Sequence, residues 1–275
     1  MNTAARNGLP ELATEALKML QTIGVSPQEH HFAAIIEAFC KRDRVKEAIL
    51  VLDLMASSGV ESSLGTAEPI AECIQHSAEQ IDAAWNQVKQ LHQEDRHLHI
   101  STCQTIIMGA VTNGDLAKAL VLHRALPDFG HSLSVDLYNY LLQGCIQSAD
   151  RQVGDTLLSE MKTAKIKPNQ ETHENFIRLC LTQDVYEDAF FYLEEMKAAG
   201  HKPSSSIYTA LIEKCLSSND SRYRIALQEM EECGYIIPAS LQNHLEIDKK
   251  QEDAAASIRR LSEDEQRFIE QGGLV

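Results

Sequence analysis

A spacing of about 35 residues recurs along the chain and constrains its fold more than any other feature. Pro168, Pro203 and Pro238 stand 35 residues apart, and Pro27 has the same phase further upstream. A second series, mostly glycine, advances in steps of 34 to 36 residues through Gly24, Gly59, Asp95, Gly130, Lys165, Gly200 and Gly234. Such self-similarity indicates a solenoid, in which each unit packs against its neighbours.

Two further phases have the same period. Small residues hold one of them, at Ala13, Ala48, Ala84, Ala119, Gly154 and Ala189. Rings hold the other, at Tyr138, His173 and Tyr208. Agreement at four separate phases indicates one structural unit that is repeated.

Apolar residues within a unit follow helical spacing. One run is Phe32, Ile35, Ile36 and Phe39, and the next, after a polar break, is Val45, Ala48, Ile49, Leu52 and Met55. The glycine phase is expected to end each second helix in a left-handed cap, and the proline three residues later prevents continuation. We therefore expect an all-α chain, a right-handed α-solenoid of antiparallel helix hairpins.

The composition restricts the function. The chain has 25 Lys and Arg against 40 Asp and Glu, a net charge of −15, which disfavours binding of nucleic acid by bulk attraction. No apolar run reaches the roughly 18 residues of a membrane span, so no membrane partner is expected. Seven cysteines without a CxxC pair indicate a reducing compartment and buried thiols.

Motifs of catalysis are missing from the sequence. It contains no nucleophile elbow, no Gly-rich phosphate loop and no HExxH. Cys145, Cys180 and Cys215 recur at 35 residues, but equivalent positions of stacked helices lie about 10 Å apart, too far to share a metal. His92, His97 and His99 are interpreted as a solvated loop. We expect a binding protein without an enzymatic activity, a cofactor, a metal or a small-molecule substrate.

Several segments together resemble the pentatricopeptide repeat family. They are 138–139 at the start of a first helix, 160–162 near the end of a second helix, and 166–169 (Ile-Lys-Pro-Asn) after it. Segments 195–197, 202–203 and 208–212 repeat this match, and 40–41 with 45–48 give another. The resemblance covers roughly residues 10–240. The Trp signature of the tetratricopeptide repeat is missing, since the single tryptophan, Trp85, falls in a second helix.

The phases predict a division into units. Six full repeats are expected at 29–63, 64–99, 100–134, 135–169, 170–204 and 205–239, after a leading half repeat in 1–28 and before capping helices or a tail in 240–275. Residues 1–8 are too few and too polar for a first helix to pair with the apolar helix that follows. This suggests a fragment of a longer array.

The resemblance implies that two positions per repeat select one RNA base: the residue after the opening aromatic and the residue after the terminal proline. The pairs here are Ala33 with Ser63, Glu68 with His99, Gln104 with Ser134, Asn139 with Asn169, Glu174 with Ser204, and Thr209 with Ala239. Only Asn139 with Asn169 matches a common combination, and it implies a pyrimidine.

The first helices carry few cationic residues that could contact the phosphates of RNA. These helices carry the cations Lys41, Arg178 and Lys214 against Glu29, Glu37, Glu68, Glu72, Asp136, Glu171, Glu174 and Glu213. The densest basic cluster is Lys41, Arg42, Arg44 and Lys46, which could contact a phosphate or an acidic partner, or be a solvated turn. Weak to moderate RNA binding is expected.

Two functions remain open from the sequence. One is single-stranded RNA binding in organellar, mitochondrial RNA metabolism or translation, which rests on the family resemblance alone; a cytoplasmic location is the alternative. The other is a protein-binding scaffold whose acidic concave face does not read bases.

Overall fold

The computed structural model describes residues 1–94, 96 and 100–242, and this part of the chain is helical without a β-strand. The chain divides after Gln183 into two compact units. Unit 1 ends at Gln183, unit 2 begins at Asp184, and each is described by itself. The all-helical expectation is confirmed. Of the segment 240–275, predicted as capping helices or a tail, residues 243–275 lie outside the described residues.

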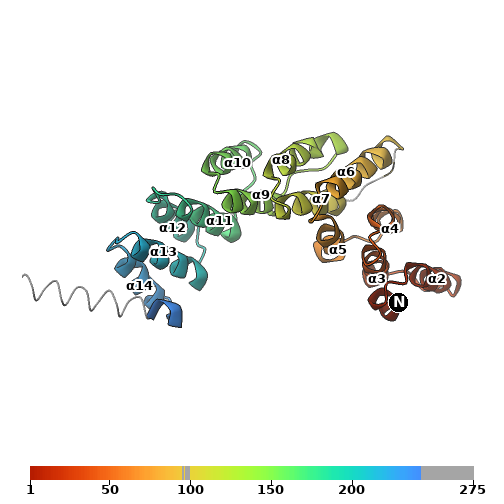
Figure 1. Cartoon of the computed structure of the whole chain (residues 1–275), viewed down its shortest axis with the longest axis horizontal. Coiled ribbons are helices and arrows are strands. Elements are labelled where there is room, and N and C mark those ends of the chain that lie inside the picture. Colours follow the sequence, from red (N-terminus) through yellow and green to blue (C-terminus); the bar gives the residue numbers. More distant parts are fainter. Residues whose placement is uncertain (95, 97–99, 243–275) are drawn as a thin grey trace, which may run out of the picture. The chain divides into compact units, whose positions relative to one another are not determined.

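Unit 1 is a succession of helical hairpins (Figure 1). Its first helices are α1 (Asn2–Arg6), α3 (Glu29–Cys40), α5 (Leu64–Ile74), α7 (Ile100–Thr112), α9 (Val135–Ser148) and α11 (Gln170–Leu181). Its second helices are α2 (Pro10–Thr22), α4 (Val45–Ser57), α6 (Ala78–Gln93), α8 (Leu116–Ala125), which continues into the 3-10 turn η1 (Leu126–Phe129), and α10 (Arg151–Thr163).

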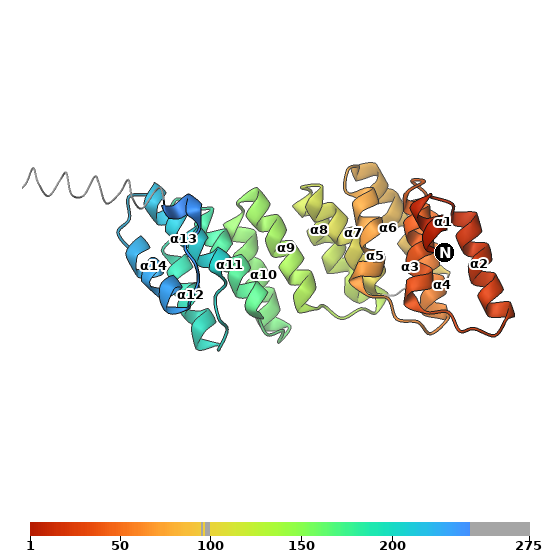
Figure 2. The ribbon, with the colours of Figure 1, turned by 90° about the horizontal axis from the view of Figure 1, so that it is seen from below.

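The first helices of unit 1 form one continuous row. Each packs against the next, from α1 through α3, α5, α7 and α9 to α11, as Figure 2 shows. The second helices form another layer, and Figure 1 shows α6, α8 and α10 together on one side of α7, α9 and α11. We call the layer of α1, α3, α5, α7, α9 and α11 the first-helix row.

Left-handed residues end the second helices, as the glycine phase predicts. Gly59 has φ 71°, its N–H bonds the Ala56 carbonyl, and the N–H of Val60 bonds the Met55 carbonyl. This is the paired bonding of a Schellman cap. The other described members of the series share the positive φ: Gly24, Gly130, Lys165, Gly200 and Gly234. Lys165 adopts φ 57° with a side chain, which costs strain that glycine avoids.

The small-residue phase is the place where second helices meet their neighbours. Ala48, Ala119 and Ala189 are fully buried. A Cβ on Gly154 would lie 2.2 Å from Cδ2 of Leu179 on the following first helix. Close approach of the helices therefore limits this position to the smallest side chains.

The start of the chain differs from the expected lone second helix. Residues 2–6 form the short helix α1, whose Ala4 and Ala5 are buried against its neighbours α2 and α3. The polarity of residues 1–8 suggested that no helix would form there. Two alanines suffice, because the rest of the contact is made by polar groups of the next repeat, described below.

Unit 2 continues the hairpin pattern with α12 (Asp188–Ala198), α13 (Ser205–Ser217) and α14 (Tyr223–Glu232). The Tyr186 hydroxyl bonds Asp220 at 2.8 Å, and Lys197 of α12 bonds Glu229 of α14 at 2.6 Å. The Arg222 guanidinium beside Asp220 holds the pKa of that carboxyl well below its usual range. The first contact joins the turns that precede α12 and α14, and the second joins the two helices themselves. The boundaries of the six repeats stay a prediction.

Candidate nucleic-acid interface

Paired polar residues lie where one first helix meets the start of the next. Gln104 on α7 donates its side-chain amide to Oγ of Ser134 at 3.3 Å. Ser134 also caps α9 by accepting from the N–H of Leu137 at 3.4 Å. The two residues predicted as a base-selecting pair are thus brought together, although only 8% of the Gln104 surface is exposed.

The pair Asn139 and Asn169 is also in contact, within a denser network. Nδ2 of Asn139 donates to Oδ1 of Asn169 at 3.2 Å and to Oε2 of Glu171 at 3.1 Å. Its Oδ1 accepts from the Thr172 hydroxyl at 2.7 Å. Asn139 is only 1% exposed, so both amide protons and one acceptor site are committed inside the protein.

Asn169 has the more accessible position of the two. Its Oδ1 caps α11 through the N–H of Thr172 at 2.9 Å, and its side chain is half-buried. The sequence does not reveal this asymmetry, because the spacing of 30 residues predicts proximity and not burial. Asn169 is thus the more exposed member of the pair, and Asn139 is buried beside it.

The other predicted selectors are placed differently. Glu174 lies on α11 and accepts from Gln170 at 3.3 Å, while Ser204 belongs to unit 2, near Ser206 at 2.9 Å. Thr209 bonds the carbonyl of Ser205 within its own helix at 2.9 Å. His99, the expected partner of Glu68, lies outside the described residues.

A carboxylate makes the equivalent contact near the start of the chain. Oε1 of Glu29 accepts from the Ser63 N–H at 2.8 Å and from the Thr66 hydroxyl at 2.6 Å. These hydrogen bonds lower the pKa of Glu29. Sequence reasoning counted Glu29 only as a charge, but Glu29 and Glu171 both join consecutive repeats. Their shared position in the first turn of a first helix is the feature of the sequence that could have predicted this contact.

The basic cluster holds the leading hairpin. Nε of Arg42 donates to the Gly8 carbonyl at 2.7 Å, and Lys41 reaches both Glu37 at 2.6 Å and the Arg6 carbonyl at 3.4 Å. Arg44 bonds Glu11 at 2.5 Å and Glu47 at 2.9 Å. Lys46 is exposed. Three of the four predicted phosphate contacts therefore already have protein partners.

The other two predicted cations lie in separate units. Arg178 is half-buried on α11 in unit 1. Nζ of Lys214 in unit 2 sits 5.4 Å from the centre of the Tyr186 ring, a cation–π contact. Both side chains thus have contacts within the protein.

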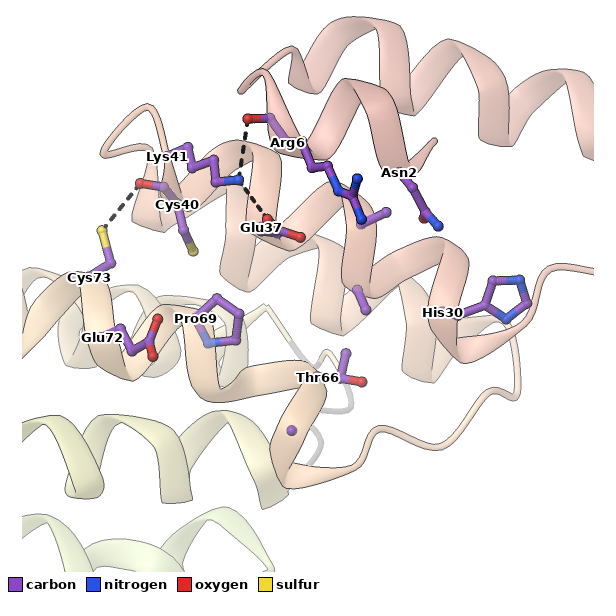
Figure 3. A pocket seen from close by; sticks show the side chains of 13 residues that line it. Asn2, Arg6, His30, Glu37, Cys40, Lys41, Thr66, Pro69, Glu72 and Cys73 are labelled. Atoms are coloured by element: carbon purple, nitrogen blue, oxygen red, sulfur yellow. Dashed lines mark hydrogen bonds and ion pairs between the residues drawn. The ribbon is translucent and has the colours of Figure 1, made fainter.

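A pocket of about 700 Å³ opens on the first-helix row between α1, α3 and α5 (Figure 3). Figure 3 shows Arg6 and Lys41 on one side, with Glu37 close to Lys41 and Glu72 on the opposite wall. Burial raises the pKa of Cys40 to about 12 and that of Cys73 to about 11. Both lining thiols are therefore protonated and weakly nucleophilic at neutral pH.

Clusters of metal-ligating side chains and helices able to cross a membrane were sought among the described residues. No three His, Cys, Asp or Glu side chains of residues 1–94, 96 and 100–242 gather as metal ligands. His92 packs edge-on to Phe129, with ring centres 4.8 Å apart, while His97 and His99 lie outside the described residues. None of the described helices combines the length and the apolar character needed to cross a bilayer.

Comparison with known proteins agrees with the hairpin geometry. Residues 1–126 match a family model described as pentatricopeptide repeat-containing protein, and residues 121–183 and 157–217 match the pentatricopeptide repeat domain. A pentatricopeptide repeat-containing protein of Arabidopsis thaliana is 26% identical over 156 residues, which are 55% of this chain and 27% of that protein. The chain thus spans about a quarter of that relative's length.

Solved structures share the fold. Two structures of the pentatricopeptide repeat protein PPR10 in complex with an 18-nucleotide psaJ RNA element superpose on this chain with a TM-score of 0.55 at 18% identity. PPR10 has also been solved from maize. The superposition covers 98% of this chain and 39% of PPR10. Since the family models together reach across residues 1–217, the chain belongs to the pentatricopeptide repeat family.

Proposed function

We propose that this chain is a single-stranded RNA-binding module that contacts RNA along its first-helix row. The observation that carries the proposal is the side-by-side placement of Gln104 with Ser134 and of Asn139 with Asn169, at 3.3 and 3.2 Å. Amides and hydroxyls placed at such regular intervals match the hydrogen-bonding edges of successive bases. The similarity to PPR10, which was solved with RNA, supports the same ligand class.

The binding is expected to be weak to moderate. Phosphate neutralisation supplies most of the nonspecific affinity for nucleic acid, and the first helices carry more carboxylates than cations. Lys41 is already paired with Glu37. The family setting is organellar, so we place this function in mitochondrial RNA metabolism or translation. The module binds and does not catalyse.

We assign base selection to Asn169, whose side chain is held in place by Asn139. The half-buried Asn169 meets the base, and the buried Asn139 fixes its orientation through the 3.2 Å bond. The combination implies a pyrimidine by family resemblance. Asn139 is thus a positioning residue for this contact.

Binding to short RNAs that differ at one position tests this assignment. Wild type should favour a pyrimidine at one position, and Asn169→Ser should lose this preference, because serine keeps a cap oxygen for α11 but lacks the amide. One good base contact is worth about 1–3 kcal/mol, or roughly 5- to 150-fold. Thr163→Ala, an exposed change on α10, is the matched control and should keep the preference. Equal binding of every RNA by wild type would refute base selection.

A protein scaffold is the second candidate function, and the acidity of the first helices favours it. Glu37 and Glu72 line the pocket between α3 and α5, and Glu68 is exposed on α5. A basic segment of a partner protein would complement these carboxylates. Competition distinguishes the two functions: a lysine-rich peptide that binds while RNA does not bind even at low salt would replace the RNA proposal.

A further inference from the structure

Three lysines occur within the short stretch where α10 leads into α11. Lys162 stands in the last turn of α10, and Lys165 and Lys167 belong to residues 164–169, which join the two helices. All three side chains are exposed, and none of them makes a hydrogen bond, an ion pair or a ring contact within the described part of the chain. Other cations of unit 1 are paired with carboxylates: Lys41, Lys118 and Arg124.

Lys165 holds a backbone position that glycine fills elsewhere in the series. Its φ is 57°, and the residues that share this left-handed conformation at the same phase are Gly24, Gly59, Gly130, Gly200 and Gly234. A lysine there carries strain that glycine avoids, and residues held in such conformations often serve a function. Since the Lys165 side chain makes no contact within the described residues, the fold itself gives no reason for it.

The connection ends at Asn169, the more exposed member of the base-selecting pair. Lys167 precedes Asn169 by two residues, so their Cα atoms lie at most about 7 Å apart. Pro168 favours an extended conformation for Lys167, and Asn169 is itself extended, with φ −102° and ψ −176°. Every base of an RNA strand is attached to the phosphate backbone. A base at Asn169 therefore brings a phosphate within reach of a long side chain two residues away.

Neighbouring connections of unit 1 lack this pair of cations. The residues equivalent to Lys165 and Lys167 are Gly59 and Glu61 after α4, and Gly130 and Ser132 after η1. In unit 2 the position of Lys167 is taken by Lys202, which donates to the Cys233 carbonyl at 3.1 Å and lies 4.7 Å from the centre of the Tyr235 ring. The unpaired lysines thus coincide with the repeat whose base-selecting pair matches a common combination.

We propose that Lys165 and Lys167 together bind one phosphate of an RNA strand, at the nucleotide whose base contacts Asn169. This inference rests on the proposed RNA-binding function. Lysine ammonium groups are compact charges on flexible stems, which suits a phosphate contact that carries no sequence information. Because Lys41 is already paired with Glu37, this contact leaves the expected total at about three phosphates.

One carboxylate opposes a phosphate at this place. Glu171 lies in the first turn of α11, two residues after Asn169, and it accepts from Asn139 at 3.1 Å and from Gln143 at 3.3 Å. These hydrogen bonds direct the carboxylate toward α9. Two lysines against one carboxylate leave a net positive charge beside Asn169, which explains why a single lysine would not suffice.

The salt dependence of binding to a short single-stranded RNA tests the proposal. The double variant Lys165→Gly with Lys167→Gln should bind less tightly at low salt, with a slope of log affinity against log salt concentration that is shallower by about 0.7. Its preference for a pyrimidine should stay as in wild type, because a phosphate contact does not read the base. Lys89→Gln, which removes an exposed charge from α6, is the matched control and should keep the wild-type slope.

Two further measurements exclude an indirect effect. Lys165→Gly relieves backbone strain, so a melting temperature at or above that of wild type would show that weaker binding does not come from unfolding. Replacing both lysines by arginine keeps the charges and should keep the wild-type affinity and slope. Arginine variants that bind as weakly as the double variant would contradict a role of the charges.

An RNA with one uncharged methylphosphonate linkage locates the phosphate. Moved along the strand, this linkage should weaken wild-type binding at a position beside the selected pyrimidine. At that position it should not weaken the double variant further, since the contact is already lost. Equal losses in the two proteins would show that the lysines and this phosphate do not interact.

The outcomes separate this contact from the proposed function. No RNA binding by wild type at the lowest salt would overturn both. RNA binding with the same slope in wild type and in the double variant would overturn the contact alone and leave the RNA-binding function standing. A polyglutamate peptide that binds through Lys165 and Lys167, while RNA binding is unchanged in the double variant, would assign these lysines to an acidic protein partner instead.

Discussion

The side-chain amide of Asn139 on α9 donates to Oδ1 of Asn169, which caps α11, at a distance of 3.2 Å. One hydrogen bond thus joins the two members of a predicted base-selecting pair across consecutive repeats. The same amide bonds Glu171, and its oxygen accepts from Thr172 at 2.7 Å. The residues assigned to RNA recognition therefore also hold the repeats together.

Removing this amide should destabilise the protein. Asn139→Ala deletes three side-chain hydrogen bonds, of which the one from the Thr172 hydroxyl is fully buried, so we expect a loss of about 1–3 kcal/mol in the free energy of unfolding. Urea denaturation measures it. Thr209→Ala, at the same phase of a later repeat, loses one bond within its own helix and should change stability by less than about 0.5 kcal/mol. Equal effects of the two changes would contradict a joining role for Asn139.

A substitution at the left-handed cap residue Lys165 should increase stability, in contrast to Asn139→Ala. Lys165→Gly should stabilise the protein by about 0.5–1 kcal/mol, because glycine adopts φ 57° without strain. Gly200→Ala, at the same phase with φ 83°, should destabilise it by a similar amount. Thermal unfolding measures both, and a loss of stability in Lys165→Gly would show that the lysine side chain matters more than its backbone strain.

The basic cluster should control the leading hairpin. Arg42→Ala removes the bond to the Gly8 carbonyl, and we expect faster proteolysis within residues 1–25 while the rest of unit 1 stays resistant. Lys46→Ala is the control, since Lys46 is exposed on the neighbouring helix. If Arg42→Ala and Lys46→Ala are cleaved at the same rate, Arg42 does not hold the hairpin.

Stability should depend on pH through His123 on α8, which is buried and whose ring nitrogens make no hydrogen bond in the described part of the chain. In the unfolded chain its pKa is near 6.5, and in the folded protein it is about 4, so the unfolded state binds the proton first as the pH falls. Its contribution is therefore complete above about pH 7 and declines between pH 6.5 and pH 4, by about 3 kcal/mol in total.

The comparison with His123→Leu isolates this effect from the carboxylates that titrate in the same range. Tyr138, Arg124 and Glu160, which face the ring, are unchanged in the variant. The stability advantage of His123→Leu over wild type should grow as the pH falls from 7 to 4. Parallel curves for the two proteins would show that His123 titrates normally.

Backbone features with a strict residue preference were predictable from the sequence. The glycine series predicted the caps after the second helices, and even Lys165 has the left-handed conformation that its phase requires. A parallel series of left-handed residues inside the hairpins escaped notice: Gly8, Asp43, Gly114, Ala149 and Asn219 share positive φ at nearly the same period. Four residue types fill it, so no single residue marks the turn in the sequence.

The site was less predictable because burial depends on packing between repeats. The spacing predicted that Asn139 lies near Asn169. It did not predict that Thr172 and Glu171 also hydrogen-bond the Asn139 side chain and bury it. Arg42 and Arg44 read as free cations, because their partners Gly8 and Glu11 lie more than 30 residues away. His123 was passed over because one polar residue in a core phase does not disturb the repeat pattern.

The salt dependence of RNA binding tests the central claim most directly. Each phosphate neutralised on a single strand contributes about −0.7 to the slope of log affinity against log salt concentration. With Lys41, Arg178 and Lys214 as the cations of the first helices, we expect detectable binding at low salt, a slope no steeper than about −2, and weak binding near physiological salt. Tight binding at physiological salt with a slope that implies six or more phosphates, or no binding at the lowest salt, would contradict it.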